Sequence, residues 1–178
     1  MVTALMGAAC GEGFATPTPT SPTPAQSPFV SQFGGYWNGS LTMSDVRGGE
    51  CVGQDLRTTI GSRDIGTVVI AQTRTDVAAT TRSETTGLVC RYQGTAGLAA
   101  FSVSTAECDV SELLFQCANG SSRVLEQVAS TMTATLNGNT ATGTVATWYN
   151  VFADSTVEEQ RRPVAGLITE QRFTAFRR

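Results

Sequence analysis

The sequence predicts an all-β domain, a single antiparallel up-and-down β-barrel or a β-sandwich, preceded by a disordered N-terminal tether rich in Pro and Thr. Three observations lead to this prediction. From Phe33 onward, runs of β-branched residues alternate with glycines at a spacing typical of about eight to ten short strands. Residues 122–152 carry the signature of a long hairpin, and five of the six prolines lie before residue 33.

The tether occupies residues 11–32, where the prolines are interleaved with Thr, Ser, Ala and Gln. A segment of this composition cannot bury enough apolar surface to fold, and its prolines favour the extended polyproline II conformation. At about 3 Å per residue, the segment would span roughly 60 Å. We therefore interpret residues 11–32 as a linker that leads into the β-domain, residues 33–178.

Cys10 stands immediately before this linker, after the small residues Gly7, Ala8 and Ala9 and a short apolar run. This order resembles the lipid-attachment site of bacterial lipoproteins, in which the cysteine becomes the acylated N-terminus. The resemblance implies that residues 1–10 are the remnant of an export signal. It also implies that Cys10 carries a lipid that anchors the exported protein to a membrane of the bacterial cell envelope, on the periplasmic or the outer surface. The alternative is that Cys10 is an unmodified thiol at a disordered end.

The β-domain itself contains four cysteines, Cys51, Cys90, Cys108 and Cys117. An even number in an exported domain indicates two disulfides, whose connectivity the sequence leaves open. We predict a Cys108–Cys117 bond, because these residues close a short loop, and therefore a Cys51–Cys90 bond. Histidine and C-x-x-C pairs are both absent from the sequence, which argues against a zinc site, and we expect no metal or other cofactor.

The clearest strand pair lies within residues 122–152. If Asn137-Gly138 forms a two-residue turn, Leu136 pairs with Asn139 and the register is set. The threonine pairs are then Thr135 with Thr140, Thr133 with Thr142, and Thr131 with Thr144. One face of the hairpin is a threonine ladder and the other is largely apolar, as a half-buried antiparallel pair requires.

Trp148 falls on the threonine face in this register, opposite Gln127. We expect that a β-bulge turns it inward or that another part of the protein covers it. The alternative is that Trp148 and Tyr149 form a candidate interaction surface.

Further strands are predicted at residues 35–46, 54–60, 65–75, 77–84, 87–94, 97–106 and 166–176. Helical structure is expected only as single turns. One is predicted at Asp109–Glu112, because these residues have the spacing of a capping box, and another within residues 156–160.

Gly35-Tyr36-Trp37 opens the first of these strands. The motif resembles the G-x-W that begins the first strand of calycins, the lipocalin-like barrels. In that family the Trp closes the base of the barrel and an Arg of the last strand packs across it. The resemblance implies a barrel in which Trp37 and Arg172 form this closing pair. The alternative is that Trp37 is an ordinary core aromatic residue.

The composition argues against two classes of function. The net charge is −3 and the sequence contains no histidine, so we expect no nucleic-acid partner and no enzymatic activity. Two functions remain. The protein is an envelope lipoprotein whose barrel binds a small apolar ligand, or it is a structural or protein-interaction module that engages another envelope protein and has no ligand cavity.

Overall fold

The computed structural model describes residues 32–110, 112–153 and 162–178. The predictions for residues 1–10, for Cys10 and for the linker up to residue 31 lie outside the described residues, as does the predicted turn within residues 156–160. The elements are β1 (Gly35–Gly48), α1 (Glu50–Arg57), β2 (Arg63–Thr73), β3 (Asp76–Ser83), β4 (Val89–Ala96), β5 (Ala100–Cys108), β6 (Glu112–Gln116), β7 (Ser122–Asn137), β8 (Thr140–Ala153) and β9 (Ala165–Arg177). Within the described part of the chain, no helix is both long enough and apolar enough to span a bilayer.

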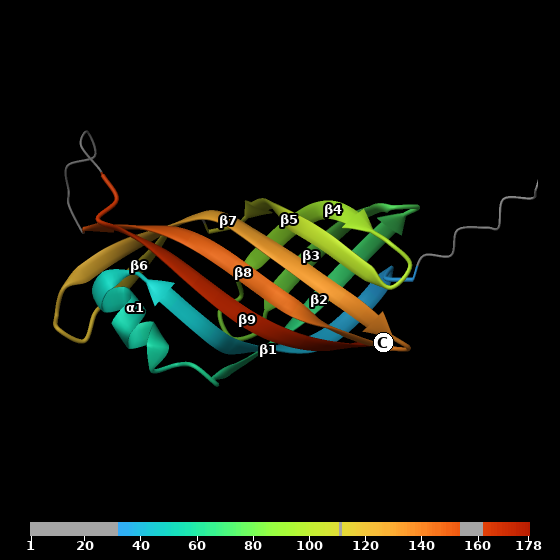
Figure 1. Cartoon of the computed structure of the whole chain (residues 1–178), viewed down its shortest axis with the longest axis horizontal. Helices are drawn as coiled ribbons and strands as arrows, with labels where there is room; N and C mark the ends of the chain where they lie inside the picture. Colours follow the sequence, from blue (N-terminus) through green and yellow to red (C-terminus); the bar gives the residue numbers. More distant parts are fainter. Residues whose placement is uncertain (1–31, 111, 154–161) are drawn as a thin grey trace, which may run out of the picture.

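Eight of the strands close an antiparallel up-and-down barrel (Figure 1). Strands that follow one another in the sequence pair, except for β5 and β6, and β9 pairs back with β1. The ring also needs the pairing of β5 with the second half of β7, while the short strand β6 pairs with the first half of β7. The predicted all-β barrel is confirmed, and the sandwich alternative is wrong.

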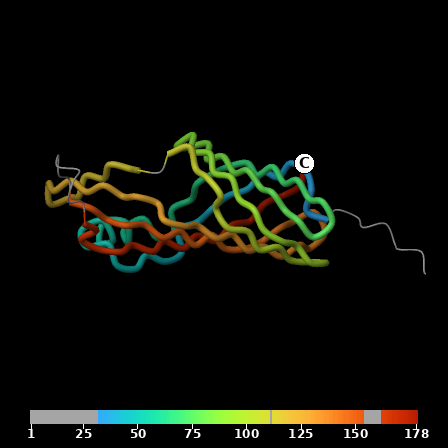
Figure 2. The backbone as a smooth tube through the Cα atoms, turned by 90° about the horizontal axis from the view of Figure 1, so that it is seen from above, coloured from blue at the N-terminus to red at the C-terminus, as the bar shows by residue number. Residues whose placement is uncertain are grey.

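The molecule has two apolar cores because its strands differ in length. β1, β7, β8 and β9 have 13 to 16 residues, whereas β3 and β4 have 8. The long strands therefore continue past the barrel as an open sheet, on which α1 packs (Figures 1 and 2). The barrel interior forms the first core, and the second core includes Val52 of α1 together with Val46, Leu125, Val151 and Leu167 of the sheet extension.

Helix α1 corrects the prediction of a strand at residues 54–60. Val52 and Leu56 are four residues apart and lie on one side of the helix, where they pack against the sheet extension. Glu50 in the first turn and Arg57 in the last complement the helix dipole. The helical turn predicted at Asp109–Glu112 is also wrong, because Glu112 begins β6 and pairs with β7.

The β7–β8 hairpin has the predicted faces in a different register. Asn137 pairs with Thr140, so the turn residues are Gly138 and Asn139, and Thr135 faces Thr142 instead of Thr140. Gly138 has a φ of 59°, as a type II′ turn requires at its first central position. A shift of two residues keeps every side chain on its original face, so the threonine ladder remains outside.

The two disulfides are Cys51–Cys117 and Cys90–Cys108, so the predicted pairs Cys51–Cys90 and Cys108–Cys117 are wrong. Cys90 and Cys108 face each other in the β4–β5 ladder, with their Cα atoms 4.1 Å apart. Cys108 cannot reach Cys117, because the extended strand β6 separates them by roughly 17 Å at 3.3 Å per residue. Two disulfides are characteristic of proteins that fold in an oxidising, exported environment.

The base of the barrel is closed by Trp37, which is 1% exposed and donates a hydrogen bond from its indole N–H to the Phe33 carbonyl over 2.8 Å. Arg177, not Arg172, packs across the ring, with its guanidinium carbon 4.8 Å from the ring centroid. Arg177 lies directly opposite Trp37 in the β1–β9 ladder. Arg172 is five residues earlier in an alternating strand, so it faces outward, between Thr42 and Thr144.

Candidate functional site

The barrel interior is not filled by its own side chains. A cavity of about 250 Å³ lies between β1, β2, β3, β4, β7, β8 and β9. Its apolar lining includes Leu41, Val68, Met132, Val145, Phe173 and Ala175. The base of the barrel, in contrast, is packed with large aromatic rings, among them Trp37 and an edge-to-face pair of Phe33 and Phe101.

Small residues explain why space remains at this level. Gly39, Gly66 and Ala175 line the cavity. A Cβ atom on Gly39 would come within 2.9 Å of the Ala175 Cβ and of the Thr174 carbonyl oxygen. The neighbouring strands β1 and β9 therefore approach each other closely here, and the residues at the contact are too small to reach the centre of the barrel.

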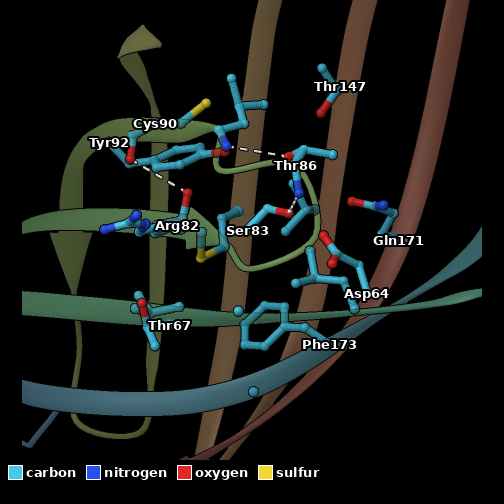
Figure 3. A pocket seen from close by; sticks show the side chains of 18 of the residues that line it. Asp64, Thr67, Arg82, Ser83, Thr86, Cys90, Tyr92, Thr147, Gln171 and Phe173 are labelled. Carbon is cyan, nitrogen blue, oxygen red and sulfur yellow. Dashed lines mark hydrogen bonds between the residues drawn. The ribbon is translucent and has the colours of Figure 1, made fainter. Parts of the chain in front are cut away.

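A polar wall faces this apolar lining. Tyr92 of β4, Thr147 and Tyr149 of β8 and Gln171 of β9 all line the cavity. Tyr92, Thr147 and Gln171 are labelled in Figure 3. Behind them, the hydroxyl of Ser130 is 3.0 Å from that of Thr147 and 3.5 Å from that of Tyr92. Ser130 is only 1% exposed, so this chain of hydroxyl groups is part of the barrel interior.

The phenol of Tyr149 is neutral in this setting. Burial raises its pKa above the ordinary value, and the nearby Tyr92 raises it further. Hydrogen bonds with Thr147 and Thr169 lower the pKa by less than these two effects raise it. Tyr149 therefore remains a protonated hydrogen-bonding group throughout the physiological pH range.

Gln171 is the member of the polar wall with unused hydrogen-bonding capacity. Its side chain points toward the cavity (Figure 3), and its amide has no hydrogen-bond partner among the residues that the structure describes. Gln127, which also lines the cavity, instead donates to Cys108 Sγ over 3.2 Å. Gln171 is half-buried at the cavity, so its amide is available to form hydrogen bonds with a ligand or with water there.

The mouth of the cavity lies beside the loop between β3 and β4, where the lining residues Arg82 and Thr86 are exposed. The loop is ordered by its own hydrogen bonds, because the Thr86 N–H donates to the Ser83 hydroxyl and the Thr85 hydroxyl donates to Asp64. Partial burial raises the pKa of Asp64, but hydrogen bonds from the Thr85 and Ser83 side chains and from the Ile65 and Thr85 backbones together lower it below its ordinary value.

Charged groups are confined to this mouth. Asp64 and Arg82 are the charged residues among the described residues that line the cavity. The guanidinium of Arg82 points away from Gln171 and Phe173 (Figure 3). The interior of the cavity thus combines apolar side chains with neutral hydrogen-bonding groups.

The structure separates Trp148 from Tyr149, which the sequence suggested as one interaction surface. Adjacent strand residues point to opposite faces, so Tyr149 lines the cavity while Trp148 lies half-buried outside, opposite Ala129 and Ile168. A β-bulge does occur, between Gln127 and Ala129 of β7, but it leaves Trp148 on the outer face.

Sequence reasoning missed the polar wall. The sequence does contain a signal for this wall, because side chains alternate between the two faces of a strand. Thr147 and Tyr149 of β8, and Thr169 and Gln171 of β9, thereby occupy inward-facing positions. Tyr92 and Ser130 lie on strands that are distant in the sequence, and only the closed barrel brings them to the same wall. No protein-family model matches the chain, and no curated protein sequence or solved structure is significantly similar to it.

Proposed function

We propose that this protein is a cell-envelope lipoprotein whose calycin-like barrel binds a small, largely apolar ligand. The observation that supports this function best is the cavity of about 250 Å³ with its apolar lining. An apolar cavity of about 150 Å³ binds benzene, so by proportion this one accommodates about ten non-hydrogen atoms. A module without a ligand cavity, the alternative from the sequence, does not account for this space.

Two features support the calycin-like and envelope parts of the proposal. The G-x-W tryptophan, Trp37, lies at the base of the barrel with an Arg of the last strand, Arg177, packed across it. The two disulfides suit an oxidising compartment and use all four cysteines of the β-domain. Cys10 is thereby left without a partner among them, as a lipid-bearing cysteine would be.

Binding is tested with propylbenzene, an apolar probe of about the expected size. We expect propylbenzene to shift the methyl NMR signals of Met132 and Val145, which line the cavity. Val68→Trp places an indole in the cavity and should abolish these shifts. Val69→Trp is the matched control, because Val69 is the next residue of β2 but lies on the outer face and is 39% exposed. Unshifted signals in the unmodified protein at saturating propylbenzene would refute the proposed function.

Membrane attachment is tested by Cys10→Ser in a chain that carries a complete export signal. Acyl chains contribute about 0.8 kcal/mol per buried CH₂, so losing them should move the protein from the membrane fraction to the soluble fraction. The barrel should stay folded, with an unchanged unfolding midpoint. Retention of the Ser variant in the membrane fraction, or a disulfide between Cys10 and a cysteine of the β-domain, would contradict the anchor.

A further inference from the structure

We infer that the ligand is an uncharged amphiphile, with an apolar body and one hydroxyl or carbonyl group that binds at the polar wall of Tyr92, Thr147, Tyr149 and Gln171. This inference rests on the proposed function and specifies the chemical class of the ligand. It follows from how polar, apolar and charged groups are distributed around the cavity.

The polar wall offers both donors and acceptors to a ligand. A hydroxyl group can donate one hydrogen bond and accept two. The Tyr92–Ser130–Thr147 chain uses only part of this capacity, and its two ends line the cavity. The Gln171 amide adds a carbonyl oxygen and an NH₂ group that have no partner among the described residues. A single hydroxyl or carbonyl of a ligand could thus be bound from several directions.

The rest of the lining suits an apolar body. Val68, Met132, Val145 and Phe173 present only hydrocarbon and thioether surface to the cavity. Burying apolar ligand surface against them contributes about 25 cal/mol per Å². A ligand with two or more polar groups at opposite ends would leave one of them unpaired against this surface, which is costly.

Charge is excluded by the same lining. A carboxylate at the polar wall would meet no cation, because Arg82 is at the mouth and exposed. An ammonium group would have to compete for the Asp64 carboxylate, which already accepts hydrogen bonds from the Thr85 hydroxyl and the Ile65 N–H. Burying an unpaired charge costs far more than burying a neutral hydroxyl.

The test uses four probes of nearly the same size and shape: propylbenzene, 2-phenylethanol, phenylacetate and phenethylammonium. Affinities are measured by NMR titration of the unmodified protein and of Gln171→Met, which keeps the side-chain volume but removes the amide. We expect Gln171→Met to lower the affinity for 2-phenylethanol about tenfold relative to the affinity for propylbenzene, the equivalent of one hydrogen bond. Both charged probes should bind at least about 100-fold more weakly than 2-phenylethanol.

Thr147→Val provides a second, independent variant, which should also lose affinity for 2-phenylethanol relative to propylbenzene. Its matched control is Thr142→Val, because Thr142 is on the outer face of the same strand and exposed. If propylbenzene binds but neither variant affects 2-phenylethanol selectively, the polar wall holds only water and the inference is overturned while the proposed function stands. Tight binding of phenylacetate or phenethylammonium also overturns it. If neither uncharged probe binds, the proposed function fails as well.

Discussion

Gly143→Ala is expected to lower the free energy of unfolding by about 3 kcal/mol or more, because the barrel cannot close around the added methyl group. A Cβ atom at Gly143 of β8 would lie 1.9 Å from the carbonyl oxygen of Thr133 and 2.9 Å from the Cα of Ala134. Both atoms belong to the backbone of β7, so a side-chain rotation cannot relieve the overlap. Guanidinium-induced unfolding of the oxidised protein measures the effect.

Gly166→Ala is the matched control for this variant. Gly166 lies in β9, the strand next to β8, and a Cβ atom there would meet nothing within 4 Å. The substitution should change the free energy of unfolding by less than about 0.5 kcal/mol. Equal stabilities of the two variants would show that β7 and β8 are not held as closely as the structure indicates.

Removal of the Cys51–Cys117 disulfide should have the largest effect on the second core. These cysteines are 66 residues apart, and for a loop of this length the chain-entropy model gives a loss of about 4 kcal/mol. The bond also holds α1, whose 8 residues are too few to form a stable helix alone. We expect the Cys51→Ala/Cys117→Ala protein to unfold at a lower guanidinium concentration and to be cleaved by trypsin after Arg57, the last residue of α1.

The Cys90→Ala/Cys108→Ala protein is the comparison for this prediction. Its cysteines are 18 residues apart, which corresponds to about 3 kcal/mol in the same model. Because they lie in the β4–β5 ladder, their loss should not expose Arg57 to trypsin. Cleavage after Arg57 in this variant, or resistance of the Cys51→Ala/Cys117→Ala protein, would contradict the assigned role of the Cys51–Cys117 bond.

Local patterns in the sequence determined the all-β class, the hairpin and the faces of its strands. Side chains alternate along a strand, so the faces of β7 and β8 were predictable even though the register was off by two residues. The register depended on the turn, and Asn137-Gly138-Asn139 offers both an Asn-Gly and a Gly-Asn turn. In the structure, β8 also pairs with β9, and β7 also pairs with β5 and β6. These neighbouring strands therefore help to fix the observed register of the hairpin.

Tertiary structure alone decided how the cysteines pair, that α1 forms, which arginine packs over Trp37, and that the barrel holds a cavity with a polar wall. Each depends on residues that are distant in the sequence: Cys51 and Cys117 meet because α1 packs on the sheet extension, and Ser130 meets Tyr92 because the barrel closes. The cavity is the volume that side chains from seven strands leave between them. A local pattern carries the direction of each side chain, but not the distance to the side chain opposite, and that distance determines whether a barrel is filled or holds a ligand.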